Sequence, residues 1–236
     1  MVRSNDNSNG RSRGAALRAG KSAADVRAPD ARDRRNARRE AILAAALEEF
    51  SANGFAAARL DDVAARAGVA KGTIYLYFAD KESLFQELVR TMVSPIVGAI
   101  ESAPLAALPI RAVVEMIVET FVSKIFGTPR EDVLRLILAE GPRFPKLAEF
   151  YHREVISHVM PVLRARLVLA VEQGELRSDA LARFPQLLVA PALMAIIWSG
   201  LFERFEPLDV RELMRAHIDV LFGEKGAPGS GPRRAT

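Results

Sequence analysis

Residues 67–82 read AGVAKGTIYLYFADKE, and this stretch decides the fold. Ile74 and Phe78 lie four positions apart, the spacing that places two apolar side chains on one face of a helix. The small residues at its start, with Gly68 among them, are typical of a tight turn. We therefore predict a short helix over residues 71–78 that follows a turn and buries one face.

The residues just before the turn, RLDDVAARAGV, predict another short helix. Leu60, Val63 and Ala64 have the spacing of one apolar helical face. Asp61 and Asp62 fall in the first turn, where the helix dipole favours acidic side chains. Two short helices joined by a small-residue turn are typical of the helix-turn-helix motif, whose second helix lies in the major groove of DNA.

The exposed face of the second helix carries side chains that suit contact with DNA. Lys71 can reach a phosphate or a guanine edge, Gly72 lets the backbone approach closely, and Thr73 offers a hydroxyl and a methyl group. Tyr75 and Tyr77 can donate hydrogen bonds to phosphates or stack on sugars and bases. We predict that these five residues form the DNA-reading surface.

Regular structure is expected to begin near residue 34. Ile42, Ala46 and Phe50 then follow at helical spacing, and Gly54 is expected to stop that helix because it can adopt the left-handed cap conformation. Downstream of the motif, Asp80 can cap a further helix whose inward residues include Leu84, Phe85 and Leu88.

Beyond residue 93, apolar runs separated by Pro and Gly predict helices and no strand, because sustained period-two alternation is missing. The predicted helices are 109–126, 130–140, 145–173 with a kink at Pro161, 184–204 and 208–222. The fold class is therefore all-α, with an N-terminal three-helix helix-turn-helix domain and a larger C-terminal helical domain. The predicted segments are a disordered basic arm (1–33), the DNA-binding domain (34–80), the ligand-binding and dimerisation domain (81–223) and a flexible tail (224–236).

Charge is distributed unevenly along the 236 residues, whose net charge is +4. Residues 1–40 hold eleven Lys and Arg against five Asp and Glu, whereas residues 91–236 hold seventeen of each. A basic arm beside a DNA-reading motif favours attraction to phosphates, and its arginines at 11, 13, 18, 34, 35, 38 and 39 are expected to act as a non-specific anchor. The chain has no cysteine, which excludes disulfides and a thiol nucleophile and fits a reducing compartment.

Residues 184–202, FPQLLVAPALMAIIWSGLF, carry no charge and have the length of a membrane span. Pro185, Gln186, Pro191 and Ser199 argue against that interpretation. We expect instead a helix that is covered on most sides, in part by another subunit, and no membrane insertion.

Residues 54–85, GFAAARLDDVAARAGVAKGTIYLYFADKESLF, resemble the TetR/AcrR family of bacterial transcriptional regulators in order, spacing and residue type. The helix before this segment, from about residue 36, takes part in the resemblance, which covers about a fifth of the chain and is highly specific. Two later segments, LRLILAEGPRFPKLAEFYHREV and AIIWSGLF, look more loosely like the ligand-binding bodies of an AcrR-like branch.

The resemblance implies further DNA contacts, residue by residue. Lys71, Gly72, Thr73 and Tyr75 would face the groove, while Tyr77 and Lys81 would hold phosphates on either side of it. Arg59, just before the first helix of the motif, would reach the backbone or a base. Many members have Ser or Thr at the positions of Ala58 and Arg59, so this helix lacks the usual hydroxyl cap and its start is expected to fray.

The resemblance also implies a cytoplasmic homodimer that represses transcription and is released from an operator in double-stranded DNA by a small-molecule effector. The helices near 184–204 and 208–222 would pair with those of the second subunit. Large body side chains that could line a ligand pocket are Met92, Phe121, Phe144, Phe150, Tyr151, Met194, Trp198 and Phe202.

Two other classes of function stay open. One is an activator or architectural DNA binder without a small-molecule effector, and the other is an all-α enzyme or scaffold with a vestigial head. His152, Glu154 and His158 have spacing compatible with metal ligation, but such dispersed ligands are more often surface or core residues. We find no catalytic motif and expect no enzyme activity, no cofactor and no metal.

Overall fold

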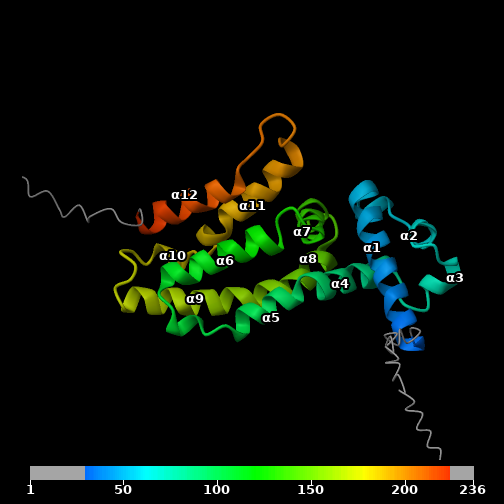
Figure 1. The fold of residues 1–236 in the computed structure, drawn as a ribbon, viewed down its shortest axis with the longest axis horizontal. Coiled ribbons are helices and arrows are strands. Elements are labelled where there is room, and N and C mark those ends of the chain that lie inside the picture. The colour runs from blue at the N-terminus through cyan, green and yellow to red at the C-terminus, as the bar shows by residue number, and fades with distance from the viewer. Residues whose placement is uncertain (1–29, 224–236) are drawn as a thin grey trace, which may run out of the picture.

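The computed structural model describes residues 30–223, and this part of the chain contains helices and no strand (Figure 1), which confirms the all-α prediction. In chain order the elements are α1 (Ala31–Ala57), α2 (Leu60–Arg66), α3 (Lys71–Ile74), α4 (Lys81–Met92), α5 (Ser94–Ser102), the 3-10 turn η1 (Leu105–Ala107), α6 (Ile110–Lys124), α7 (Pro129–Glu140), α8 (Pro145–Tyr151), the π-helical turn η2 (His152–Ile156), α9 (Ser157–Glu172), α10 (Ala180–Arg183), α11 (Gln186–Leu201) and α12 (Val210–Phe222).

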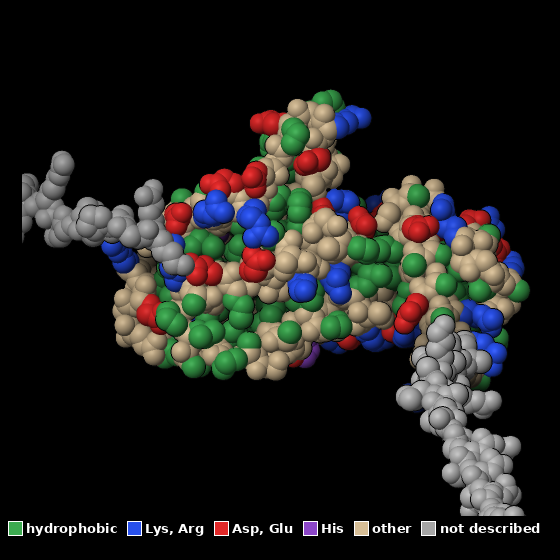
Figure 2. Space-filling view, viewed as in Figure 1, with side chains coloured by type: hydrophobic (Ala, Val, Ile, Leu, Met, Phe, Trp, Pro, Cys, Tyr) green, Lys and Arg blue, Asp and Glu red, His purple; other side chains and the backbone are tan. Residues whose placement is uncertain are grey.

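Helices α1–α3 form one end of the molecule, which we call the head, and α5–α12 form the body (Figure 1). Helix α4 joins the two, since it packs against α1 in the head and against α7 and α8 in the body. Within the body, α9 lies beside α5 and α6, and α12 packs on α6. The connection between α11 and α12 projects from the body (Figure 2).

Helix α1 begins at Ala31. We had predicted a disordered arm up to residue 33, and residues 31–33 are helical instead. The reason is a capping box: the Asp30 side chain accepts the Asp33 N–H at 2.8 Å, and the Asp33 side chain accepts the Asp30 N–H at 3.3 Å. Arg34, Arg35, Arg38 and Arg39 therefore lie on a helix. The rest of the predicted arm, with its arginines 11, 13 and 18, and the predicted tail lie outside the described residues.

Gly54 interrupts α1 with a positive φ of +72°, but its ψ of 163° is not that of the predicted left-handed cap, and Gly54 does not end the helix. The chain then makes one further helical turn that ends at Ala57. The break turns Phe55 inward, where its side chain is 0% exposed. Its ring centroid lies 5.4 Å from that of Phe50 in α1, 6.2 Å from that of Phe85 in α4 and 5.0 Å from that of Phe144 ahead of α8.

The core around Phe55 is shared by the head and the body. It contains buried side chains of α1, α2 and α3 together with Leu84 and Leu88 of α4, Val133 of α7 and Phe150 of α8. The apolar packing therefore runs through the predicted domain boundary at residues 80 and 81, and that division stays a prediction. Two further apolar clusters, one around α6 and α9 and one between α6, α11 and α12, fill the body.

The second helix of the motif is shorter than predicted, because α3 ends at Ile74 instead of residue 78. The chain continues in tight turns, in which Leu76 N–H donates to the Thr73 carbonyl at 3.1 Å and Tyr77 N–H donates to the Ile74 carbonyl at 3.0 Å. Such bonds between residues three apart tighten a helix end. Ile74 and Phe78 are nevertheless both buried, as predicted.

The predicted helix 145–173 consists of α8, η2 and α9 in direct succession, and its irregularity is not centred on Pro161. The distorted turn is η2, where Ser157 N–H donates to the carbonyl of His152, five residues back. Pro161 lies inside α9 and has no N–H for the usual bond. The π-helical turn just upstream has wider hydrogen-bond spacing, which helps the backbone to accommodate Pro161.

Helices α5 and α10 were not predicted. Helix α5 follows α4 after Val93 and has Pro95 in its first turn, which is a sequence signal for the start of a helix.

Asp80 caps α4 as predicted, through a bond of 2.7 Å from Ser83 N–H to its carboxylate.

Helix α11 does not fit a membrane span, and no helix between residues 30 and 223 combines the length and hydropathy needed to cross a bilayer. One side of α11 is buried in the body through Leu188, Ala195 and Ile196. The other side leaves large apolar residues exposed, namely Leu187, Leu193, Met194, Ile197 and Leu201.

The position of Phe55 predicts a large loss of stability on its removal. Phe55→Ala should lower the free energy of unfolding by about 3–5 kcal/mol, because a fully buried aromatic ring is replaced by a cavity. Urea unfolding followed by circular dichroism measures this. Leu76→Ala is the control, since Leu76 is 79% exposed and its truncation should change stability by less than about 0.5 kcal/mol. Equal effects of the two substitutions would contradict the packing described here.

Candidate nucleic-acid interface and apolar cavity

The head holds α2 and α3 at a fixed angle through a short turn. Gly68 has a φ of +65°, a conformation that other residues adopt rarely. The Val69 N–H donates to the Ala64 carbonyl at 3.0 Å and closes the end of α2. Val63 of α2 and Ile74 of α3 are completely buried, so these side chains anchor both helices and their other faces point outward.

The predicted DNA-reading residues lie on this outer surface. Lys71 and Gly72 are exposed, Thr73 and Tyr77 are half-buried, and the Tyr75 side chain is 49% exposed. Figure 2 shows Lys and Arg side chains on the head, intermixed with Asp and Glu. The surface thus combines hydroxyl groups, aromatic rings and positive charge, the chemistry that contacts phosphates and base edges. Their contact with DNA stays a prediction.

Lys71 is held in place by an ion pair across the motif. Its Nζ lies 2.6 Å from a carboxylate oxygen of Asp61 in α2. The pKa of Lys71 is raised, first by the hydrogen bond to Asp61 and then by the charge of Asp61. The ammonium is therefore fully charged at neutral pH and pre-positioned at the start of α3, on the side of the motif that faces solvent.

Lys81 is engaged within the protein, in addition to the phosphate contact that the family resemblance implies. Its Nζ donates to the carbonyls of Phe55 at 2.8 Å and Ala56 at 2.9 Å, and it lies 4.9 Å from the centroid of the Phe55 ring. A lysine has three N–H donors, so one remains for a phosphate. Its structural role at the end of α1 was not evident from the sequence.

Arg59 is exposed and forms the N-cap of α2 without a side-chain cap bond. The α2 helix thus lacks a hydroxyl cap, as expected, while the DNA contact of Arg59 stays a prediction.

Two residues that the sequence analysis did not assign to the reading surface lie beside it. The guanidinium of Arg35 lies 5.9 Å from the centroid of the Tyr77 ring. Leu76 exposes its side chain next to Tyr75. Its position between two predicted DNA-contacting tyrosines is the sequence feature that could have assigned Leu76 to this surface.

The break at Gly54 is clamped from both the body and the linking helix. The Phe55 N–H donates to Glu140 Oε1 at 3.2 Å, although the two residues are 85 positions apart. A Cβ on Gly54 would lie 2.6 Å from the same oxygen, so a larger residue would displace this carboxylate and would also be strained by the φ of +72°. On the other side, Lys81 holds the carbonyl of Phe55. The end of α7 and the start of α4 therefore hold the two adjacent peptide groups on either side of the Phe55 Cα.

An apolar cavity of about 260 Å³ lies in the body. Its wall is built from α5, α6, α7, the α8–α9 run and α11 together with Val93 at the end of α4. The lining residues are Val93, Ile96, Val97, Ile100, Ile117, Thr120, Phe121, Ile125, Arg130, Leu134, Ile137, Leu138, Tyr151, Val155, Ile156, Val159, Met160, Val189, Ala192, Leu193 and Ile196.

The cavity includes two of the eight predicted pocket residues, Phe121 and Tyr151. The other six lie elsewhere. Phe144 and Phe150 belong to the core shared with the head, and Met92 packs against that core. The side chain of Met194 is exposed on α11, and the rings of Trp198 and Phe202 contact one another at 5.0 Å near the projecting connection. Aromatic and Met content alone could not separate core from cavity wall.

Three cavity-lining residues carry polar side chains. The Thr120 hydroxyl donates to the Met116 carbonyl at 2.8 Å and is thus satisfied. Burial raises the pKa of Tyr151 well above its usual range, so its phenol stays neutral. Arg130 donates from Nε to the Met92 carbonyl at 2.7 Å and from Nη1 to the Lys124 carbonyl at 3.3 Å.

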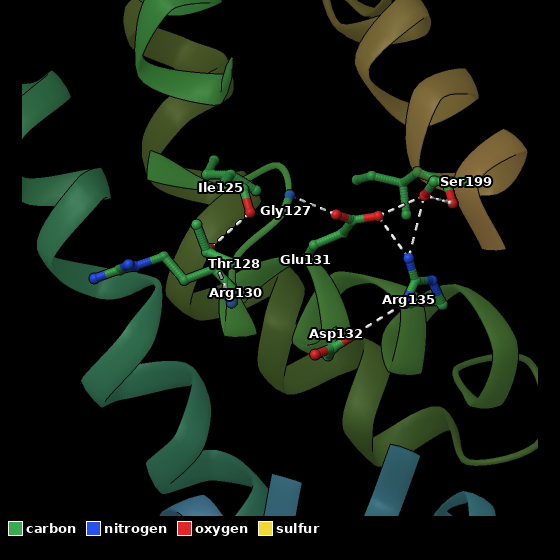
Figure 3. Close-up of polar contacts among 9 residues, drawn as sticks. Ile125, Gly127, Thr128, Arg130, Glu131, Asp132, Arg135 and Ser199 are labelled. Atoms are coloured by element: carbon green, nitrogen blue, oxygen red, sulfur yellow. Dashed lines mark hydrogen bonds and ion pairs between the residues drawn. The ribbon is translucent and has the colours of Figure 1, made fainter. Parts of the chain in front are cut away.

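A polar cluster fixes α7 to α11 beside the cavity (Figure 3). The buried carboxylate of Glu131 accepts from Ser199 Oγ at 2.6 Å, from Arg135 Nη2 at 2.5 Å and from the Gly127 N–H at 2.7 Å. Arg135 Nη1 also donates to Asp132 at 2.9 Å. The pKa of Asp132 is raised, because the effect of burial exceeds the opposing effect of the Arg135 charge. This cluster holds the start of α7 in register with α11.

The residues considered for metal ligation do not form a site. His158 Nδ1 lies 2.8 Å from Glu101, while Glu154 faces Arg90 at 3.8 Å. Within residues 30–223, no group of three His, Cys, Asp or Glu side chains could hold a metal ion.

Comparison with known proteins identifies relatives of both the head and the body. A family model described as bacterial regulatory proteins of the tetR family matches residues 42–88, and a second, described as the C-terminal domain of AefR-like transcriptional repressors, matches residues 112–221. The HTH-type transcriptional repressor KstR2 of Rhodococcus jostii is 29% identical over 151 residues, which are 61% of this chain and 71% of that protein. The HTH-type transcriptional regulator YhgD of Bacillus subtilis is 39% identical over 72 residues, 30% of this chain and 38% of that protein.

The first of the curated relatives are thus matched over only 37% to 38% of their own length. Among solved structures, the transcriptional regulator FadR from Bacillus subtilis in complex with stearoyl-CoA has a TM-score of 0.59 at 19% identity, over 79% of this chain and 99% of that one. At this identity the likeness shows a shared fold.

The clamp on the Phe55 backbone predicts that Glu140 stabilises the junction through its acceptor oxygen. Glu140→Ala should lower the free energy of unfolding by about 1–3 kcal/mol, because the buried Phe55 N–H loses its partner. Glu140→Gln keeps an acceptor and should recover more than half of that loss. Glu149→Ala, on the exposed face of α8, is the control in the same urea titration. If Ala and Gln at position 140 are equally destabilising, the hydrogen bond is not the cause.

Proposed function

Since this chain belongs to the TetR family of bacterial regulatory proteins, we propose that it is a homodimeric repressor of transcription that a small-molecule ligand releases from its operator in double-stranded DNA. It would act in the cytoplasm, where that DNA is. The observation that carries this proposal is a physical link: an outward-facing helix-turn-helix surface and a partly open apolar cavity are joined by the same two helices, α4 and α7.

The reading surface supports DNA binding. Lys71, Thr73 and Tyr75 are available to the major groove, with the cation of Lys71 held by Asp61 until a phosphate or base competes for it. Arg35 and Tyr77 form one edge of this surface, and we propose that the Tyr77 hydroxyl donates to a phosphate. Leu76 would contact an apolar group such as a thymine methyl.

The cavity supports a ligand-responsive regulator over the DNA binder without effector that the sequence left open. A partly open cavity of about 260 Å³ with an almost wholly apolar wall has the chemistry of a small-molecule site. A protein that only bound DNA would gain stability from filling or covering this cavity with side chains, because removing apolar surface from water stabilises a fold.

The route from the cavity to the head is short. Helix α4 starts at Lys81, which holds the Phe55 carbonyl, and ends at Met92, next to the cavity residue Val93. Helix α7 starts beside cavity residue Arg130 and ends at Glu140, which holds the Phe55 N–H. A ligand that displaces either helix would therefore turn the head, and the ligand and the operator would weaken each other's binding by the same factor.

The exposed apolar side of α11 supports a dimer. Leu187, Met194 and Leu201 lie seven positions apart and Ile197 falls between them, which is the spacing of a helix that packs along another helix. A second copy would cover this side, and two heads on one dimer would read two half-sites of a symmetric operator.

The DNA contacts are tested on fragments that the protein selects from genomic DNA. Lys71→Ala should weaken binding about tenfold and make the logarithmic dependence of affinity on salt shallower by about one unit, because one phosphate contact is lost. Tyr77→Phe should weaken binding without changing that slope, since only a neutral hydroxyl is removed. Lys146→Ala, an equal loss of charge on the exposed part of α8, is the control. Unchanged affinity and slope in both head variants would favour the scaffold alternative.

The dimer is tested by a charge placed in the α11 stripe. Met194 is 50% exposed in the single chain, so Met194→Glu should leave the fold intact and bury two like charges in the interface. Analytical ultracentrifugation at micromolar concentration should then find a monomer where the unchanged protein is a dimer. Val168→Glu, at an apolar site of α9 that is 44% exposed, should remain dimeric. A Met194→Glu dimer would exclude this surface as the interface.

A further inference from the structure

Arg130 is the only charged residue on the cavity wall in the described part of the chain. Its guanidinium is half-buried and has five N–H donors, of which the structure assigns two, to the carbonyls of Met92 and Lys124. These contacts give Arg130 a structural role at the ends of α4 and α6. They provide no negative charge.

No carboxylate within residues 30–223 lies within ion-pair distance of Arg130, since its recorded polar contacts are to carbonyl groups alone. Three other arginines of the body differ from Arg130 in having carboxylate partners. Arg135 pairs with Glu131 and Asp132, Arg166 with Glu175, and Arg111 with Asp219. Arg130 therefore has no carboxylate partner within the described residues, and an anionic group in the cavity could pair with its guanidinium without displacing one.

We propose, building on the ligand-responsive function above, that the cavity binds a small amphipathic carboxylate, whose apolar chain fills the cavity and whose carboxylate pairs with Arg130. A planar guanidinium matches a carboxylate through two parallel hydrogen bonds. The wall offers one positive charge, which balances a carboxylate but only half of a phosphate monoester. At about 30 Å³ for a water-sized group, the volume of about 260 Å³ fits a chain of about nine non-hydrogen atoms.

The same pairing gives the ligand a route to the head. The carbonyl that accepts from Arg130 Nε belongs to Met92, the last residue of α4. A carboxylate that draws the guanidinium toward the cavity competes with this carbonyl. The end of α4 would then be released from α7, and the opposite end of α4 holds the head through Lys81.

The test compares three probes of equal chain length, decanoate, decanol and decyltrimethylammonium, by isothermal titration calorimetry on the full-length protein. Decanoate should bind at least about tenfold more tightly than decanol, the difference that about one charge-assisted hydrogen bond makes, and the cation should bind most weakly. Arg130→Met should lower the affinity for decanoate to that for decanol. Arg130→Lys should restore part of the difference, because it keeps the charge without the fork.

Decanol is also the control for folding, since Arg130→Met should leave its affinity unchanged. Lys124→Met is the matched control, because it removes an exposed cation whose side chain does not line the cavity. Equal binding of decanoate and decanol by the unchanged protein would overturn the proposal, as would an Arg130→Met variant that loses both probes. Binding of no probe at all would overturn it as well.

A second measurement separates this proposal from the proposed function. The affinity for a selected DNA fragment is measured with each probe present. If decanol releases the DNA as well as decanoate does, the ligand-released repressor stands and the carboxylate class is wrong. If decanoate binds through Arg130 but leaves DNA affinity unchanged, the ligand class stands and release by this ligand is wrong.

Discussion

The backbone of Phe55 is the point on which the rest of the structure depends. Gly54 turns the chain out of α1 with a positive φ, Glu140 accepts the Phe55 N–H, and Lys81 binds the Phe55 carbonyl. The buried Phe55 N–H would be costly without an acceptor, and Lys81 satisfies the carbonyl of the next peptide group where the head meets the body. The Phe55 ring then packs against aromatic rings from α1, α4 and the start of α8, and joins head and body in one core.

This junction provides a structural connection between the cavity and the predicted DNA-reading surface. Helices α4 and α7 each have one end at the cavity and the other at the Phe55 backbone, so a displacement at the cavity reaches the head through rigid elements. Arg130 lies where the two helices meet the cavity and bonds to the last carbonyl of α4. Its unbalanced charge would make that contact sensitive to an anion, whereas the Glu131–Arg135–Ser199 cluster holds α7 to α11 (Figure 3).

The exposed apolar side of α11 also needs a partner. A helix whose residues are apolar all round needs cover on every side. The body covers Leu188, Ala195 and Ile196, while Met194 and Leu201 point away from it. A second copy would supply the missing cover, which explains how a sequence with the composition of a membrane span suits a helix between two subunits.

The sequence by itself determined the features that depend on neighbouring residues. The helical spacing of apolar side chains, the cap at Asp80, the interruption at Gly54 and the small-residue turn before α3 depend on residues a few positions apart, and each marked its element. Boundaries at α3 and around Pro161 were less accurate, because tight and wide turns depend on packing. Only the tertiary structure decided that Lys81 binds the Phe55 backbone, that Glu140 meets it from 85 positions away, and that Phe121 and Tyr151 line a cavity while six other predicted residues do not. Those contacts depend on how helices distant in the chain pack, and local spacing carries no information about them.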